Sequence, residues 1–254
     1  MSTPEQTSAA TGARRALVVR GGWPGHVPVE ATDRFIPYLE EQGYDVRVED
    51  SPEVYTDADA MAATDLVLQC YTMGTASNEA VAGLRAAVAA GTGFAGWHGG
   101  IADSFRNTSD YLHLVGGSFA CHPARDPGHP KGDQTDNYVQ YTVNFLPEQA
   151  DHPIVAGLED FELYSEQYWV ISDDYIDVLA TTTQAARPGD PWNRPVVSPA
   201  VWTRAWGEGR VFVATPGHSL DVLDDPTVRT LVERGLLWAS RGSASPYGVA
   251  PAAA

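Results

Sequence analysis

The sequence predicts an α/β fold built on a doubly wound, mainly parallel sheet that carries a β-rich insertion. Short apolar runs alternate with helix-like apolar stripes, which gives four strand–helix repeats joined by short links. The run 66–70 is apolar apart from one glutamine, as expected of a strand that is covered on both faces. Between residues 118 and 200 the helical stripes give way to strand-like alternation, which indicates the insertion.

The first hundred residues supply most of the predicted parallel strands. A helix capped at Thr32 or Asp33 is expected after the first strand, and a helix capped at Ser77 or Asn78 is expected to end at Gly91. The strands themselves are expected at residues 16–19, 45–48, 66–70 and 94–97.

The rest of the chain returns to the parallel pattern only near its end. A short helix is expected at 111–115, and residues 117–136 are interpreted as an irregular loop. Asp225 is expected to cap the last helix, with Pro226 at its first position. One domain should span 14–241, with a disordered tail at 1–13 and a tail of small residues and proline at 242–254. Further strands are expected at 138–143, 161–164, 175–181, 196–203 and 210–214.

Composition and charge limit the classes of partner. The chain has 254 residues and a formal net charge of −17, and 43% of its residues are hydrophobic. A surface this acidic repels phosphate backbones and anionic lipid headgroups, so nucleic acid and membrane are not expected as partners. The charge suits neutral sugars or cations, or serves only to keep the protein soluble.

The cellular compartment is predicted from what the sequence lacks. It has no apolar run of about eighteen residues, and its first residues are small and polar, so neither a membrane span nor a secretory signal is expected. Its two cysteines, Cys70 and Cys121, cannot build a disulfide framework. These features favour a cytoplasmic protein.

Three histidines follow predicted strands of the parallel sheet and lie beside glycines. They are His26, His98 and His218. Because parallel strands end at one edge, where ligands of such sheets bind, the three imidazoles are expected to share a crevice. That arrangement suits metal ligation or proton transfer, although each histidine could instead be a loop residue bonded to nearby backbone.

The segment 91–100 places His98 at a sharp strand-to-helix turn, in the sequence Gly-Trp-His-Gly-Gly. This outline matches a nucleophile elbow, but histidine stands where serine or cysteine would be, so covalent acyl transfer is not expected. Glycine-rich phosphate-binding fingerprints are absent, and no nucleotide is expected. Gly22, Gly99 and Gly100 are candidates for substrate binding, because glycine lets a ligand approach the backbone.

Glu166 is the best acidic candidate for the site. It lies in an aromatic patch, where desolvation could raise its pKa for acid–base work, or it could be a strand-end carboxylate bonded to a tyrosine or an arginine. His122 lies in the long loop and could close over the crevice, as could His129. Trp97 and Tyr168 are interpreted as core residues whose faces could also stack on sugar rings.

Five motifs, taken in order along residues 15–239, resemble those of the trehalose-utilisation (ThuA-like) family. The resemblance implies a flavodoxin-like fold of the class I glutamine-amidotransferase type, in which the amidotransferase cysteine is missing and His98 takes its place. One departure is that family members often carry Pro-Gly-His-Glu, whereas here Ser219 follows the histidine. The motifs are Gly21-Gly22 through His26, Gly-Trp-His-Gly-Gly, His152-Pro153-Ile154, Glu166-Gln167-Tyr168 and Thr215-Pro216-Gly217-His218.

The resemblance also implies a role in the metabolism of trehalose and related sugars, including 3-keto sugars made by partner oxidoreductases. We therefore expect an enzyme that acts on a keto sugar or glycoside by isomerisation, elimination or hydrolysis, with His98, His218 and Glu166 as acid–base groups or as ligands of a divalent metal. Alternatively, the metal, zinc or manganese, is expected on His98, His122 and His218. The alternative is a sugar-binding or regulatory protein without turnover. The exposed insertion could also pair two copies of the chain.

Overall fold

A nine-stranded sheet runs through the computed structural model, which describes residues 13–123 and 137–243. Its strand order is β2-β1-β3-β4-β11-β10-β9-β6-β7. In chain order these strands are β1 (Arg14–Gly22), β2 (Tyr44–Glu49), β3 (Leu66–Thr72), β4 (Gly93–Trp97), β6 (Tyr138–Phe145), β7 (Phe161–Glu166), β9 (Asp177–Gln184), β10 (Val196–Trp206) and β11 (Gly209–Ala214).

The five strands β2, β1, β3, β4 and β11 pair in parallel and form the half of the sheet that resembles flavodoxin. The apolar runs of β3, β4 and β11 are buried because helices cover both faces, as the near-continuous hydrophobic pattern predicts. The predicted α/β, flavodoxin-like fold is confirmed.

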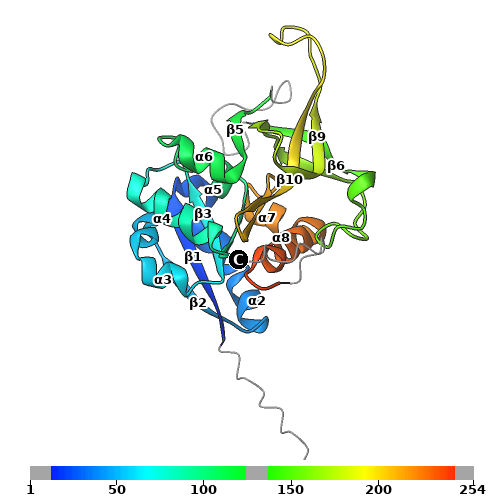
Figure 1. Ribbon diagram of the computed structural model, residues 1–254. Helices are drawn as coiled ribbons and strands as arrows, with labels where there is room; N and C mark the ends of the chain where they lie inside the picture. Colours follow the sequence, from blue (N-terminus) through cyan, green and yellow to red (C-terminus); the bar gives the residue numbers. More distant parts are fainter. Residues whose placement is uncertain (1–12, 124–136, 244–254) are drawn as a thin grey trace, which may run out of the picture.

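The helices divide between the two faces of this half (Figure 1). Phe35, Leu39 and Leu231 belong to the hydrophobic core on one face, whereas Met61, Leu84 and Ile101 belong to the core on the other. The first face carries α1 (Pro28–Asp33), α2 (Ile36–Glu41), α7 (Leu220–Leu223) and α8 (Pro226–Ala239). The second carries the 3₁₀ helix η2 (Pro52–Thr56), α3 (Ala58–Ala62), α4 (Asn78–Ala89), α5 (Gly99–Ala102) and α6 (Ser109–Val115).

Two of the three expected helix caps are present. The Ser77 hydroxyl accepts a hydrogen bond from the backbone of Ala80, and Asp225 accepts bonds from the first turn of α8. The cap expected at Thr32 or Asp33 is wrong, because α1 already ends there. Pro37 lies in the first turn of α2 and has no N–H to donate, so one continuous helix across this stretch would lack a hydrogen bond.

The insertion extends the same sheet. β11 pairs with β10 in antiparallel fashion, and β9, β6 and β7 continue outward with further antiparallel pairings. Its antiparallel strands therefore build one edge of the main sheet, and β9 and β10 project from the body as a long hairpin (Figure 1).

Part of the expected irregular loop is a strand. β5 (Gly117–Cys121) pairs with β8 (Trp169–Ser172) in a separate two-stranded sheet. The partner strand lies about fifty residues further along, so the hydrogen bonds that stabilise β5 leave no local sequence pattern. Residues 124–136 of that loop, with His129, lie outside the described residues, as do 1–12 and 244–254. The described part of the chain has no helix long and apolar enough to cross a membrane.

Candidate functional site

Three histidines meet at the carboxyl edge of the parallel strands. His26 ends the 3₁₀ helix η1 (Pro24–His26) that follows β1, His98 follows β4, and His218 follows β11. The ring centroids of His26 and His98 are 4.6 Å apart, those of His26 and His218 are 5.1 Å apart, and those of His98 and His218 are 5.2 Å apart. All three side chains are buried. The topology thus brings together residues that are far apart in the sequence.

Glu166, the last residue of β7, places its carboxylate between two of these rings. Its Oε2 atom lies 2.9 Å from His218 Nδ1 and 3.1 Å from His98 Nε2. The same two nitrogens are 3.3 Å apart. Only 6% of Glu166 is exposed, so this cluster of two imidazoles and one carboxylate is screened from bulk water.

Backbone groups fix the orientation of His98. Its Nδ1 lies 2.7 Å from the carbonyl oxygen of Thr215, and its backbone N–H donates to the carbonyl of Ala214. Because a carbonyl oxygen only accepts, Nδ1 carries the hydrogen, and Nε2 of the neutral ring presents its lone pair to Glu166.

His98 also has an uncommon backbone conformation. Its φ is +48° and its ψ is −143°, a region that residues other than glycine rarely adopt. The conformation agrees with the elbow that the sequence predicts, and it turns the side chain out of the end of β4 towards the crevice. The bonds to Ala214 and Thr215 described above hold the residue in this strained conformation.

Close packing explains three of the neighbouring glycines. A Cβ atom on Gly99 would lie 2.7 Å from Cε1 of His26, and one on Gly22 would lie 2.0 Å from the carbonyl oxygen of Thr72. A Cβ atom on Gly100 would likewise lie 2.8 Å from Cα of Cys70. The predicted contact of these three glycines with substrate stays a prediction.

Burial governs the charges in the cluster. It lowers the pKa of His98, and this effect outweighs the nearby carboxylate, which raises it. Burial, together with the neighbouring rings of His98 and His218, lowers the pKa of His26 to about 2. Burial raises the pKa of the Glu166 carboxyl, but the adjoining imidazoles of His218 and His98 outweigh it and hold that pKa well below its ordinary value, contrary to the rise expected from desolvation alone. Neutral imidazoles around an ionised carboxylate are therefore favoured.

A second set of groups surrounds this cluster. His122 Nε2 lies 3.5 Å from Oε1 of Glu166, so the ring is adjacent to the other carboxylate oxygen. Tyr168 stacks on His98 with ring centroids 4.2 Å apart. Trp97 is 1% exposed and packs against Phe35 in the core, so it lies beneath the site. The proposed roles of these side chains towards a ligand stay predictions.

Several residues that position or flank the histidines were not predicted from the sequence. Thr72 Oγ1 lies 2.8 Å from His26 Nδ1, and Asn137 Nδ2 lies 3.5 Å from Oε1 of Glu166. Tyr138 packs edge-on against His218, and Trp23, which is 43% exposed, packs edge-on against His26. Trp23 directly follows β1 and Thr72 ends β3. The signal available in the sequence was their position a few residues after the predicted strands 16–19 and 66–70.

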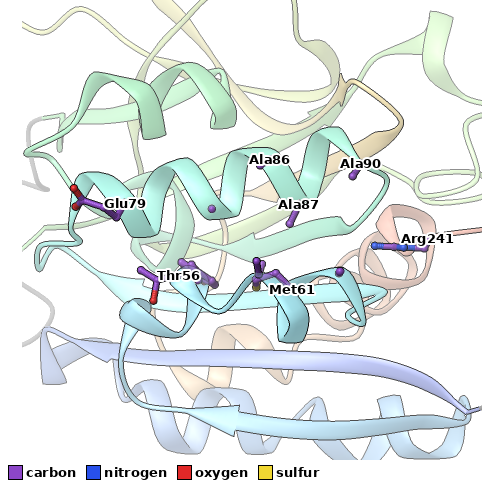
Figure 2. A pocket seen from close by; sticks show the side chains of 11 residues that line it. Thr56, Met61, Glu79, Ala86, Ala87, Ala90 and Arg241 are labelled. Carbon is purple, nitrogen blue, oxygen red and sulfur yellow. The ribbon is translucent and has the colours of Figure 1, made fainter.

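A cavity elsewhere in the molecule is unrelated to this cluster. It measures about 370 Å³ and lies between η2, α3 and α4 (Figure 2). Its walls are mainly apolar and include Met61 and Ala87, with Glu79 and Arg241 at opposite ends. None of the residues that line it belongs to the histidine cluster.

One family model matches most of the chain, and several solved structures share its fold. The model of the family described as trehalose utilisation, ThuA, matches residues 15–239. A putative ThuA-like protein from Bacteroides uniformis superposes with a TM-score of 0.68 at 16% identity, covering 93% of this chain and 95% of that one. A putative ThuA-like protein from Parabacteroides merdae gives 0.65 at 19% identity, covering 92% and 93%.

A cytoplasmic protein from Salmonella typhimurium LT2 also has this fold. Its TM-score is 0.58 at 15% identity, with 89% of this chain and 100% of that chain covered. At such identities the superpositions show the fold alone. A search by sequence among curated proteins finds no match.

Proposed function

Because the chain belongs to the trehalose-utilisation (ThuA) family, we propose that it is an enzyme that acts on an oxidised sugar or glycoside. The family points to carbohydrate metabolism, and the finer assignment rests on the chemistry of the site. The observation that carries it is Glu166 Oε2, a buried carboxylate oxygen within 3.1 Å of nitrogens from both His98 and His218.

Such a cluster is suited to moving protons. A buried carboxylate between two imidazoles holds their rings in fixed orientations and stabilises the imidazolium that forms when one of them takes a proton. Nδ1 of His98 is already bonded to Thr215, so Nε2 is its basic atom. The ring of His218, which lies on the same carboxylate, is the candidate partner for returning the proton.

A carbonyl group next to the reacting carbon makes this chemistry feasible for a sugar. Removal of the proton from that carbon by an imidazole leaves an enediolate, whose oxygen accepts a hydrogen bond from the second ring. Return of the proton to the former carbonyl carbon gives isomerisation. Elimination results if the enediolate instead restores the carbonyl, forms a double bond to the next carbon and expels the substituent on that carbon, which takes the proton from the imidazolium. We therefore favour a 3-keto sugar or glycoside as substrate.

The surroundings of the cluster suit a neutral, hydroxyl-rich ligand. The groups described around it are a hydroxyl, a carbonyl, an amide and aromatic rings, from Thr72, Thr215, Asn137, Tyr138 and Trp23. Aromatic faces stack on sugar rings, and the formal charge of −17 disfavours anionic substrates. We further propose that the protein acts in the cytoplasm and receives its substrate from a partner sugar oxidoreductase.

The test is turnover of a panel of 3-keto glycosides beside their unoxidised parents. We expect product only from the keto compounds, and a loss of about 10²–10⁴-fold in kcat/KM for each of H98A, H218A and E166Q. Glu162→Gln is the matched control, because Glu162 lies on the same strand and is exposed. The kcat/KM of this control variant should match that of the parent protein.

Two results would overturn the assignment. Full turnover by both H98A and H218A would remove the cluster from the reaction. Tight sugar binding without product over long incubation would identify a binding or regulatory protein instead.

A further inference from the structure

Three atoms that each carry a lone pair converge at the centre of the cluster. They are Nε2 of His98, Nδ1 of His218 and Oε2 of Glu166, and they are separated by 2.9, 3.1 and 3.3 Å. All three side chains are buried. Electron-rich atoms this close together need a positive group among them.

Hydrogens on the neutral rings can satisfy only some of these lone pairs. His98 has its hydrogen on Nδ1, where it is donated to the carbonyl of Thr215. His218 can place one hydrogen on Nδ1 and donate it to Glu166, which satisfies only one edge of the triangle. The lone pair of His98 Nε2 still faces the carboxylate and the second ring. One cation bound by all three atoms would satisfy them together.

The spacing matches that of ligands around a small metal ion. Zinc lies about 2.0–2.1 Å from nitrogen and oxygen ligands, so neighbouring ligand atoms of a tetrahedron are separated by roughly 3.3 Å. The three separations observed here are close to that value. Two imidazoles and one carboxylate are also a ligand set of catalytic zinc sites, which keep a further position open.

The outer contacts have the arrangement that metal-bound histidines require. A ligating imidazole commonly donates its other N–H to a carbonyl or carboxylate, which fixes the tautomer. His98 makes this contact with the carbonyl of Thr215. His26 completes a group of four side chains whose candidate ligand atoms all lie within 4.8 Å of one another.

We propose that His98 Nε2, His218 Nδ1 and Glu166 Oε2 bind one divalent transition-metal ion of the zinc class, with His26 beside the open position. The proposal deepens the proposed function and rests on it for the catalytic role of the ion, which would polarise the substrate carbonyl. A nitrogen that binds the ion cannot also take up a proton, so in the metal-bound protein the proton transfer assigned above to His98 and His218 would fall to His26. Binding itself is independent of any substrate. The sequence suggests two ligand sets, and the proposal is for the one that has Glu166 in place of His122.

His122 makes this difference measurable. It lies beside Oε1 of Glu166, the oxygen that faces away from the triangle, at 3.5 Å. It therefore supports the carboxylate from outside. Its removal should weaken metal binding by roughly 10–100-fold at most, the usual cost of losing an outer contact.

The experiment measures binding to the full chain after treatment with a chelator. Zn²⁺ is titrated by calorimetry, and Co²⁺ is added separately because its visible absorption reports nitrogen and oxygen ligands directly. We expect one ion per chain. H98A, H218A and E166Q should each lose stoichiometric binding and change or abolish the Co²⁺ spectrum. His122→Ala should keep both, and His113→Ala, which removes an exposed histidine, should match the parent protein.

Thermal unfolding of each variant with and without Zn²⁺ separates loss of the site from loss of the fold. Zn²⁺ should raise the Tm of the parent protein and of the His113→Ala control but not that of E166Q. A parent protein that binds no stoichiometric Zn²⁺ or Co²⁺ would overturn the proposal, as would a His122→Ala variant that loses the Co²⁺ spectrum while H218A keeps it. Turnover without metal binding would leave the proposed function standing, and metal binding without turnover would leave this inference standing.

Discussion

The imidazole of His98 is locked to Thr215, whose carbonyl oxygen lies 2.7 Å from Nδ1. Thr215 directly follows β11, the parallel neighbour of β4, and the backbone N–H of His98 is bonded to Ala214 at the end of that strand. The pairing of two core strands therefore sets the tautomer and the direction of the ring. The candidate base is oriented by the rigid part of the fold.

The strained backbone of His98 can be measured by comparing His98→Gly with His98→Ala. Both variants lose the imidazole, but only alanine keeps a Cβ atom at a φ of +48°. We expect the glycine variant to have the higher free energy of unfolding, by about 1 kcal/mol, in urea denaturation. Equal stability of the two variants, or a more stable alanine variant, would show that the elbow stores no strain at this position.

The sequence was sufficient to predict the parallel half of the sheet and its carboxyl edge. Runs such as 66–70 and 211–214 are mainly apolar because both of their faces are covered, and a histidine that follows such a strand must lie at the shared edge. The convergence of His26, His98 and His218 could therefore be expected from chain order alone. Caps with local hydrogen bonds, such as Ser77, were equally predictable.

Features that depend on distant pairing were not predictable. β5 is stabilised by β8, about fifty residues later, and its own sequence shows little alternation. The same limit applies within the site. Glu166 was recognised as an acidic candidate, but its contact with both His98 and His218 depends on how β7 docks at the far edge of the sheet. Glu166 and His122 therefore remained alternative metal ligands at the level of the sequence.

Gly99→Ala tests the close approach of α5 to His26. The new Cβ atom would lie 2.7 Å from Cε1 and 2.9 Å from Nδ1 of that ring, so the buried imidazole must move. We expect a loss of about 1–3 kcal/mol in the free energy of unfolding, as is usual for overpacking.

A double-mutant cycle supplies the control for Gly99. In a His26→Ala background the obstructing ring is gone, and the cost of Gly99→Ala should fall by at least about 1 kcal/mol. An unchanged cost in that background would mean that backbone constraints, and not His26, exclude a side chain at this position.

Gln69 is a polar residue in the middle of a buried strand, and its side chain links β3 to α5 and α6. Its amide donates to Tyr111 Oη at 2.6 Å, and its oxygen accepts from Tyr55 Oη at 2.9 Å. Gln69→Leu keeps the volume but leaves the Tyr55 hydroxyl buried without its acceptor. We expect the free energy of unfolding to fall by about 1–3 kcal/mol. Gln140→Leu, at an exposed position of β6, should change it by less than about 0.5 kcal/mol.

Buried His152 should make the stability of the protein sensitive to mild acid. The residue is 4% exposed and its ring lies against Trp238, and burial lowers its pKa from 6.5 to about 4. Above pH 6.5 both the folded and the unfolded chain hold this ring neutral, so its full contribution to stability is present. Between the two pKa values only the unfolded chain takes up the proton, and stability falls as the pH is lowered.

Urea unfolding of the parent protein and of His152→Gln at about pH 7.5 and about pH 5 measures this linkage, because glutamine keeps a polar side chain that does not titrate. Other groups titrate in both proteins, so the quantity of interest is the difference between their two pH-induced losses. The parent protein should lose up to about 2 kcal/mol more than the variant. His113→Gln removes an exposed histidine instead and should behave as the parent protein does. If His152→Gln shows the same pH-induced loss as the parent protein, the imidazole of His152 is not held neutral by its burial against Trp238.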